Sequence, residues 1–181
     1  EVAPGNYVPV ARISLDDGHD LALLSTGRSP NPVTLDLSSP MFLGSEGYLV
    51  GFPQGQPGEL ASKLVGRSRL VTRGTRESDM PILAWAEVGR TSGLTGTLGG
   101  ISGGPVFGKD GAVRGVIVAE SPRRGRIYTT APQSVDAFLT SMGVSREAGP
   151  SDAFRIRNYG AASDTARRRL QVVKVMCEVS A

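Results

Sequence analysis

One run of residues constrains this chain more than any other segment: positions 100–107 read Gly-Ile-Ser-Gly-Gly-Pro-Val-Phe. Glycine tolerates backbone conformations that a Cβ would block, so the chain can turn sharply around Ser102. Such a turn lets the backbone amides of Gly100 and Ser102 face one point, where they would hold the oxyanion formed when the serine hydroxyl attacks a carbonyl group. The apolar residues after Pro105 lead the chain into a buried strand. We therefore interpret Ser102 as a nucleophile with its own oxyanion hole; a glycine-rich β-turn with an incidental serine is the alternative.

A second segment, residues 19–24, reads His-Asp-Leu-Ala-Leu-Leu and places an acidic residue directly before an apolar run. A carboxylate at such a position can hold a catalytic imidazole in one tautomer and stabilise its protonated form. Asp20 is the candidate for that carboxylate. The alternative is that Asp20 is only the last polar residue before a core strand. The presence of the Ser102 motif in the same chain favours the catalytic interpretation.

The two motifs together resemble those of trypsin-like (chymotrypsin-fold) serine peptidases of bacterial type, related to Deg-type and glutamyl endopeptidase-like proteases. The resemblance extends over residues 7–143, where residues 47–53 and 112–119 are also similar to segments of bacterial relatives. It implies a serine endopeptidase that hydrolyses proteins or peptides through an acyl-enzyme. Ser102 would be the nucleophile and Asp20 the triad carboxylate, with neither a metal nor an organic cofactor.

The catalytic histidine of such a triad is missing from its expected place. The chain has one histidine, His19, directly before Asp20. Neighbouring residues of an extended segment point to opposite faces, so His19 cannot readily bond to Asp20 and also reach Ser102. In the family this histidine precedes the aspartate by tens of residues, and too few residues precede Asp20 here. We therefore expect the base on an upstream His-bearing segment of the same precursor, which stays bound or has been cut away; His19 is the less favoured base.

The fold class expected for this chain is all-β. The 24 glycines and 12 prolines, with few helical periodicities, are typical of a β protein with many turns. The resemblance implies a double antiparallel β-barrel whose first barrel is incomplete in this chain, closed by a short helix over 134–142. Residues 1–40 would form the remainder of the N-terminal barrel and the crossing between barrels, and residues 41–143 the C-terminal barrel with the nucleophile. Residues 144–181 would be an extension whose structure the sequence leaves open.

Charge, hydropathy and cysteine content exclude several other classes of protein. The 20 basic and 17 acidic residues give a net charge of +3 and are interspersed, so they form no stripe for nucleic acid. No apolar run approaches the length of a membrane span. A single cysteine, Cys177, excludes an internal disulfide and the disulfide-braced animal type of protease. The first residue is Glu1 rather than methionine, which suits removal of a signal peptide and a periplasmic or secreted bacterial protein; trimming would give the same start.

The sequence indicates the residues of the specificity pocket less clearly than it indicates the nucleophile. By alignment with the family motif, the residues expected to line it are Gly96 and Thr97 at the base and Val118, Ala119 and Glu120 on the opposite wall. The base carries no acidic residue, which argues against a basic substrate side chain and favours a small or aliphatic one. Glu120 would select a basic group if it turned inward; a solvated Glu120 is the alternative.

The segment after residue 150 is not expected to belong to the barrels. Its composition predicts a helix over 164–174 with Ser163 as N-cap. The β-branched residues within 172–179 favour a strand. The extension is too short for a PDZ domain and is expected to pack on the barrel, cover a sheet edge or mediate assembly. Cys177 is interpreted as a small apolar filler rather than a reactive thiol.

Two other interpretations remain beside the endopeptidase. A non-catalytic module would keep the protease-like cleft and bind peptides by strand addition. An inactive remnant would keep only the fold. Whether a His-bearing upstream segment accompanies the chain separates these from the enzyme.

Overall fold

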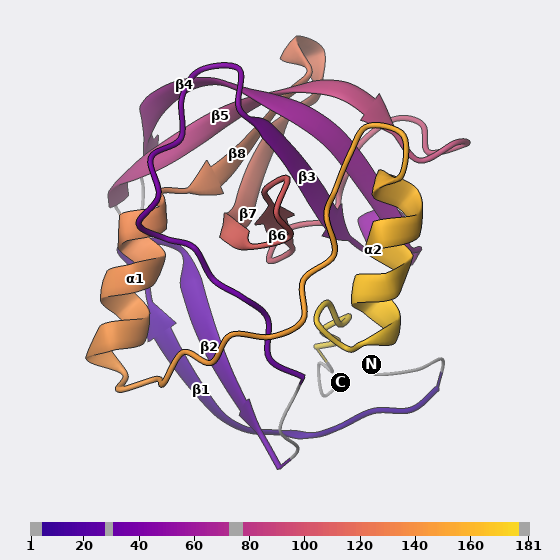
Figure 1. Cartoon of the computed structure of the whole chain (residues 1–181). Helices are drawn as coiled ribbons and strands as arrows, with labels where there is room; N and C mark the ends of the chain where they lie inside the picture. Colours follow the sequence, from indigo (N-terminus) through magenta and orange to yellow (C-terminus); the bar gives the residue numbers. More distant parts are fainter. Residues whose placement is uncertain (1–4, 28–30, 73–77, 178–181) are drawn as a thin grey trace.

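The structure is a computed structural model that describes residues 5–27, 31–72 and 78–177. The strands of its main sheet are β3 (Glu46–Gly51), β4 (Gly58–Thr72), β5 (Ser78–Arg90), β6 (Pro105–Phe107), β7 (Val113–Ser121) and β8 (Arg126–Thr130). They form a closed antiparallel barrel in the order β3-β4-β5-β8-β7-β6 (Figure 1). The predicted all-β class and the barrel that carries the nucleophile motif are confirmed.

Apolar side chains fill the interior of this barrel and also cover part of its outside. Trp85 of β5 is fully buried, and its indole N–H donates to the Thr129 hydroxyl on β8 at 3.0 Å. Strand β3 is buried on both faces: Leu49 belongs to the interior cluster, whereas Tyr48 packs outside with Phe154. A strand covered on both faces has a nearly continuous apolar sequence, as β3 does.

The N-terminal part of the chain forms a separate hairpin of β1 (Val10–Asp16) and β2 (Leu21–Thr26). It pairs with no further strand in the described ranges, so the first barrel is incomplete, as predicted. The apolar side chains of Ile13 and Leu15 are 60% and 62% exposed. A two-stranded hairpin of this kind is only marginally stable unless another element covers it.

The short helix α1 (Pro132–Ser141) closes the protease-like part of the chain. It begins two residues before the predicted range 134–142, because the fixed φ of proline suits the first turn of a helix. Its buried Phe138 belongs to the same apolar cluster as Leu21 of the hairpin and Leu37 of the crossing segment. Helix α1 therefore joins the hairpin to the barrel.

Residues 31–45 form the crossing between the hairpin and the barrel. Leu35 forms a parallel bridge with Val113, at the start of β7. The next residue, Asp36, pairs with the guanidinium of Arg114 on the same strand. These contacts fasten the crossing segment to the outside of the barrel.

The helix of the C-terminal extension lies earlier in the chain than the predicted range 164–174. The structure has α2 (Tyr159–Arg168) instead, and Ser163, the expected N-cap, is buried inside this helix. Leu170 ends the helical segment in a left-handed conformation with a φ of 57°. Glycine or asparagine usually occupies such a position, so a leucine carries no sequence signal for the helix end.

The predicted strand over 172–179 is wrong for the part that the structure describes. Residues 172–177 form no strand, and Val172 is buried against the outside of the barrel. A closed barrel leaves no free edge for an added strand, which explains the difference. Residues 178 and 179 lie outside the described ranges. Cys177 is exposed and does not fill an apolar gap, which corrects that expectation.

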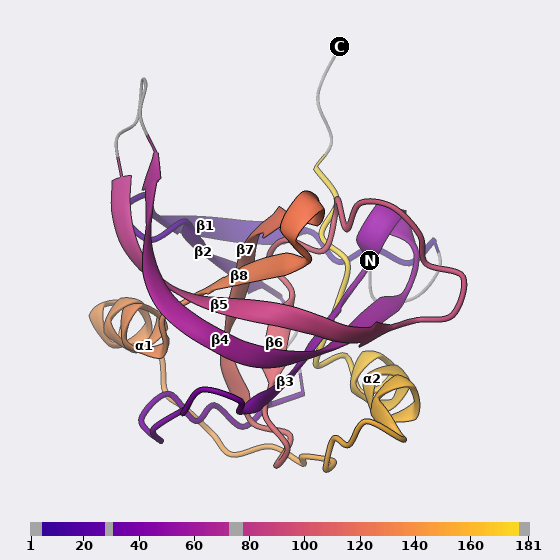
Figure 2. The same cartoon turned by 90° about the horizontal axis from the view of Figure 1, so that it is seen from above.

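The extension packs on the barrel, which is one of the roles expected for it. The Phe154 ring stacks on Tyr48 and Phe107, with ring centres 5.4 and 5.0 Å apart. Figures 1 and 2 show α1 and α2 on opposite sides of the barrel, so the two helices cover different parts of it.

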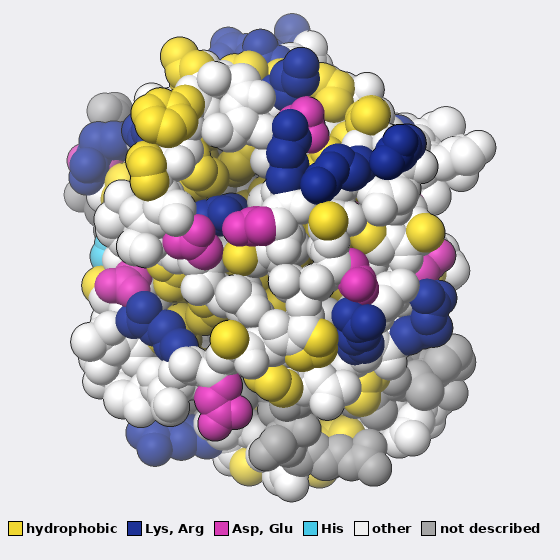
Figure 3. Space-filling view, in the orientation of Figure 1, with side chains coloured by type: hydrophobic (Ala, Val, Ile, Leu, Met, Phe, Trp, Pro, Cys, Tyr) yellow, Lys and Arg dark blue, Asp and Glu magenta, His cyan; other side chains and the backbone are white. Residues whose placement is uncertain are grey.

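Charges of both signs lie on the face seen in Figure 3, with several Lys and Arg side chains gathered toward its upper right. The ion pairs of this protein include Lys109 with Glu46 at 3.2 Å and Arg169 with Asp152 at 2.7 Å. Neither helix in the described ranges combines the length and the apolar character that crossing a membrane requires.

Candidate active site

Ser102 lies on an exposed turn between β5 and β6. The buried side chain of Ile101 anchors the turn. The backbone carbonyl of Ile101 also accepts a hydrogen bond from the Gly104 amide at 2.9 Å. The Gly103 amide donates to the Ile117 carbonyl on β7 at 2.8 Å. These bonds fasten the turn to the barrel and leave the Ser102 side chain on the surface.

Two backbone amides of this turn have no partner in the ranges that the structure describes. The amides of Ile101, Gly103 and Gly104 all donate to carbonyl groups. Among the residues that the structure describes, the Gly100 and Ser102 amides donate to none. The two N–H groups expected to form an oxyanion hole are thus available to an external acceptor.

The glycines of the motif are required by the backbone and by space. Gly100 has a φ of 93°, and a Cβ there would lie 3.1 Å from the Phe52 carbonyl oxygen. A Cβ on Gly104 would overlap the Val50 carbonyl oxygen and lie 2.9 Å from that of Ile101. These neighbours are backbone atoms of the barrel and cannot move aside as a flexible side chain would.

Asp20 lies in the turn of the β1–β2 hairpin, with an exposed side chain and a left-handed φ of 52°. Within the described part of the chain, no hydrogen bond or ion pair joins it to His19, Ser102 or any other residue. The His19 ring instead lies 2.9 Å, Nδ1 to Oδ2, from the carboxylate of Asp16. The roles expected for Asp20 and His19 stay predictions, because neither side chain contacts Ser102 in the described ranges.

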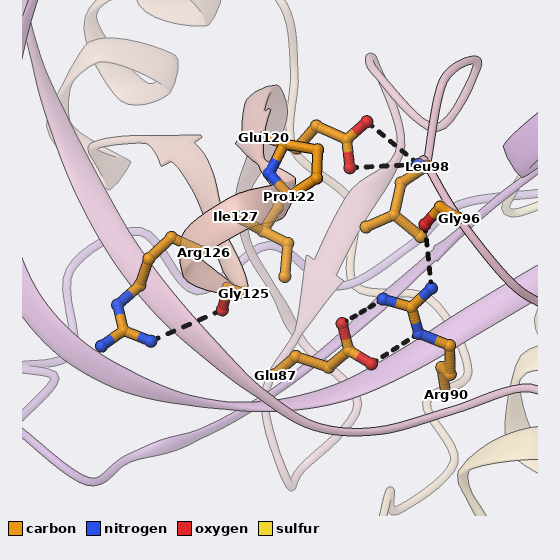
Figure 4. Close-up of a pocket in the computed structure, with 9 residues that line it drawn as sticks. All are labelled: Glu87, Arg90, Gly96, Leu98, Glu120, Pro122, Gly125, Arg126 and Ile127. Atoms are coloured by element: carbon orange, nitrogen blue, oxygen red, sulfur yellow. Dashed lines mark hydrogen bonds and ion pairs between the residues drawn. The ribbon is translucent and has the colours of Figure 1, made fainter.

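A small cavity of about 40 Å³ lies beside the Ser102 loop (Figure 4). Gly96 and Leu98 line one side of it, and Glu120, at the end of β7, lines the other. Both oxygens of the Glu120 carboxylate lie 3.0 Å from the Leu98 amide nitrogen, and one also accepts the Thr97 hydroxyl. Glu120 therefore bridges the two predicted walls and is not simply solvated.

The cavity also contains an ion pair that the sequence did not indicate. Arg90 and Glu87, both on β5, form two N–O contacts of 2.5 Å, and Arg90 donates to the Gly96 carbonyl at 3.2 Å (Figure 4). The hydrogen bonds to Glu87 raise the pKa of the Arg90 guanidinium above its ordinary value. Residues three apart on a strand ordinarily face opposite sides, so the pattern gives no sign of this pair.

The five predicted pocket residues have different positions in the structure. Gly96 and Glu120 line the cavity. Thr97 does not line it, but its hydroxyl donates a hydrogen bond to the Glu120 carboxylate. Val118 and Ala119 are half-buried on β7 and do not line it. Over the described ranges, no three His, Cys, Asp or Glu side chains gather into a possible metal site.

The family model for the trypsin-like peptidase domain matches residues 2–116. The chain belongs to this family. The matched residues include both Asp20 and Ser102, so the motifs found in the sequence lie within the family domain. A comparison with curated protein sequences finds no match.

Solved structures that share this fold include several proteases. The active form of the Rv3671c protease from M. tuberculosis superposes with a TM-score of 0.64 at 18% identity, covering 78% of this chain and 62% of that one. The apo MamO protease domain from Magnetospirillum magneticum gives 0.53 at 18% identity, with coverages of 73% and 68%. Deg5 gives 0.50 at 22% identity, with coverages of 74% and 62%. At these identities the likeness shows the fold. The chain spans 62% of the active-form Rv3671c chain, which is less than two thirds of it.

Proposed function

We propose that this chain is the nucleophile-bearing part of a serine endopeptidase. The observation that carries the proposal is the pair of amides at Gly100 and Ser102, which find no partner among the described residues, on a turn whose other amides are bonded within the protein. Preorganised donors of this kind stabilise the charge that develops on a carbonyl oxygen during attack by a hydroxyl group. Membership of the trypsin-like peptidase family supports the same role for Ser102.

In the proposed reaction, the Ser102 hydroxyl oxygen attacks the carbonyl carbon of a peptide bond while a base takes the hydroxyl proton. The Gly100 and Ser102 amides hold the oxyanion. The C–N bond then breaks, the base gives its proton to the leaving amine, and an acyl-enzyme remains. Water, deprotonated by the same base, attacks the ester carbon and releases Ser102 with its proton. These steps require neither a metal nor an organic cofactor.

The base in this proposal is a histidine on an upstream segment of the same precursor, oriented by Asp20. The exposed apolar side chains of Ile13 and Leu15 support this, because further strands of a first barrel would cover them. His19 is already paired with Asp16, so it is the less favoured base. Export to the periplasm or medium of a bacterium belongs to the same proposal.

A small or aliphatic side chain is proposed for the substrate residue on the acyl side of the cleaved bond. The cavity beside the Ser102 loop is only about 40 Å³ in volume. Its two carboxylates are both occupied: Glu120 by the Leu98 amide and Glu87 by Arg90. A basic substrate side chain would have to displace one of these partners.

The test is labelling with a fluorophosphonate probe followed by peptide mapping, on the chain alone and on the precursor with its upstream segment. We expect modification at Ser102 in the precursor, none in Ser102→Ala, and wild-type labelling in Ser92→Ala. Ser92 is an exposed serine of the same loop and serves as the control. A folded precursor whose Ser102 stays unmodified contradicts the proposal and favours the peptide-binding module or the inactive remnant.

A further inference from the structure

The turn between β3 and β4 holds the loop that carries the candidate oxyanion donors. Gln54, in the short 3-10 helix Pro53–Gly55, donates three hydrogen bonds to this loop. Its backbone N–H bonds to the Gly99 carbonyl at 2.6 Å, and its side-chain Nε2 bonds to the carbonyls of Thr95 and Thr97 at 2.8 and 2.9 Å. One residue of the turn therefore holds three carbonyl groups of the segment just before Gly100.

Gln54 has a backbone conformation that residues with a Cβ seldom adopt, with a φ of 54°. Such a conformation is costly and persists where surrounding contacts impose it, often at functional sites. In this conformation the backbone N–H and the side chain of Gln54 both reach the same loop. Gln56, two residues later, is exposed and extended, with a φ of −108°.

The bond between Gln54 and Gly99 bears directly on the Gly100 donor. The carbonyl of Gly99 and the N–H of Gly100 belong to one peptide unit, and in a trans peptide they point in opposite directions. A donor that holds the carbonyl on one side therefore fixes the N–H on the other. Rotation of this peptide unit would break the Gln54 bond and turn the Gly100 N–H away from the place beside Ser102.

The C-terminal extension fixes the two ends of the same turn. Gly51 and Gly58 face each other where β3 ends and β4 begins. Arg167 of α2 donates to both of their carbonyls, at 3.3 and 2.6 Å. The same guanidinium pairs with Glu59 at 2.8 Å, and the two side chains are only 10% and 9% exposed. Removing one partner of such a buried pair is strongly unfavourable, so Arg167 is a firm attachment point between α2 and the turn.

Two further contacts join the extension to this turn. The Lys174 ammonium donates to the Gly55 carbonyl at 3.2 Å. The Arg167 guanidinium lies 5.8 Å from the centre of the Phe52 ring, within the range of a cation–π interaction. The extension thus holds the turn, and the turn holds the loop before Ser102.

We propose that Gln54 is a positioning residue for the Gly100 oxyanion donor, and that the C-terminal extension fixes the turn that presents it, chiefly through Arg167. The catalytic consequence rests on the proposed function. The positioning itself does not, because the order of the loop is measurable without any reaction.

The first experiment measures amide hydrogen exchange and the amide NMR resonance of Gly100 in the whole chain. Gln54→Ala removes the two side-chain bonds, each a modest contribution in water, so we expect exchange of the loop amides to rise about tenfold. The Gly100 resonance should shift, while the amides of β4 and β5 keep their protection. Gln54→Gly keeps the N–H donor and suits the left-handed φ, so it should hold the loop better than Gln54→Ala.

Gln56→Ala is the matched control and should leave the loop as in the wild type. Equal exchange and an unmoved Gly100 resonance in Gln54→Ala and Gln56→Ala would overturn the role of Gln54. The second arm uses Arg167→Lys, which keeps a positive charge beside Glu59 but cannot bond in the same way to both turn carbonyls. We expect it to loosen the same loop. If Arg167→Lys does not fold, hydrogen exchange of the loop is measured in Lys174→Ala instead. Loop exchange equal to that of the wild type, in whichever of these variants folds, overturns the role of the extension.

The reactivity arm uses the precursor and the fluorophosphonate probe. We expect Gln54→Ala to lower the rate of covalent modification of Ser102 by about tenfold or more while probe binding stays the same, because oxyanion donors act in the transition state. If wild-type Ser102 is unreactive, the proposed function fails, and hydrogen exchange still decides the positioning role. If Ser102 reacts at the same rate in wild type and Gln54→Ala, the positioning role fails and the proposed function stands.

Discussion

The Glu120 carboxylate accepts the hydrogen bond of the Leu98 amide, with both of its oxygens 3.0 Å from the nitrogen (Figure 4). This bond joins the end of β7 to the loop that leads to Ser102, across the two walls of the cavity. Each wall belongs to the barrel through its own strands, so the carboxylate connects two segments that the sheet does not pair directly.

Replacing Glu120 with alanine should loosen the loop. The Leu98 amide would lose its acceptor in a partly buried place, at a cost of about 1 kcal/mol in the free energy of unfolding. Hydrogen exchange at Leu98 should rise, measured residue by residue. Glu147→Ala, at an exposed glutamate of the extension, is the control and should leave Leu98 protected. Unchanged protection of Leu98 in Glu120→Ala would show that the bond contributes nothing to loop order.

The substitution Gly104→Ala should damage the Ser102 turn severely. The new Cβ would overlap the Val50 carbonyl oxygen of the barrel, and forced overpacking costs about 1–3 kcal/mol or more. Chemical denaturation of both variants measures this cost. Gly99→Ala is the matched control, because its Cβ would meet only the Thr97 hydroxyl at 3.7 Å. Equal stability of the two variants would contradict the conclusion that position 104 has no space for a Cβ.

The pair of Asp36 and Arg114 should make the protein less stable in acid. Burial alone would raise the pKa of Asp36, but hydrogen bonds from Ser39 and the Arg114 guanidinium lower it to about 2. A carboxylate whose pKa is lower in the folded state stabilises the protein above its unfolded pKa of about 3.9 and loses that contribution as the pH falls towards 2.

Denaturation of wild type and Asp36→Asn at several pH values tests this. We expect the wild type to exceed the variant by about 2 kcal/mol near neutral pH, with the difference vanishing between about pH 4 and pH 2. Asp110→Asn removes the more exposed partner of the same guanidinium, 53% exposed, and should change stability little. A difference between wild type and Asp36→Asn that does not vary with pH would contradict the role of the pair.

The variant Ser163→Ala should be neutral or stabilising. The Ser163 side chain is fully buried in α2, and among the described residues its hydroxyl has no hydrogen-bond partner. Removing an unsatisfied hydroxyl and adding a better helix former both favour the folded state, by up to about 1 kcal/mol. Ser62→Ala is the contrast, because that buried hydroxyl donates to the Gly47 carbonyl at 2.7 Å and its loss should cost about 1 kcal/mol. Thermal unfolding of both variants measures the difference; a larger loss in Ser163→Ala would mean that its hydroxyl is bonded.

The sequence by itself was enough for the features that depend on local pattern. The glycines around Ser102 predict a sharp turn, because the backbone there needs conformations and space that a Cβ does not allow. Alternation of apolar residues predicts strands, because successive side chains of a strand face opposite sides. The triad role of Asp20 and the missing base stay predictions, since the described residues make no bond that tests them.

Only the tertiary structure decided which distant segments meet. Gln54, in the turn between β3 and β4, and Glu120, at the end of β7, both hold the loop before Ser102, and no periodicity in the chain encodes their hydrogen bonds. The helix end at Leu170 was missed for the same reason: packing of the extension imposes a left-handed residue where the sequence has no glycine. Local pattern determines which face of an element is buried, whereas the partner of that face depends on how the closed barrel brings remote elements together.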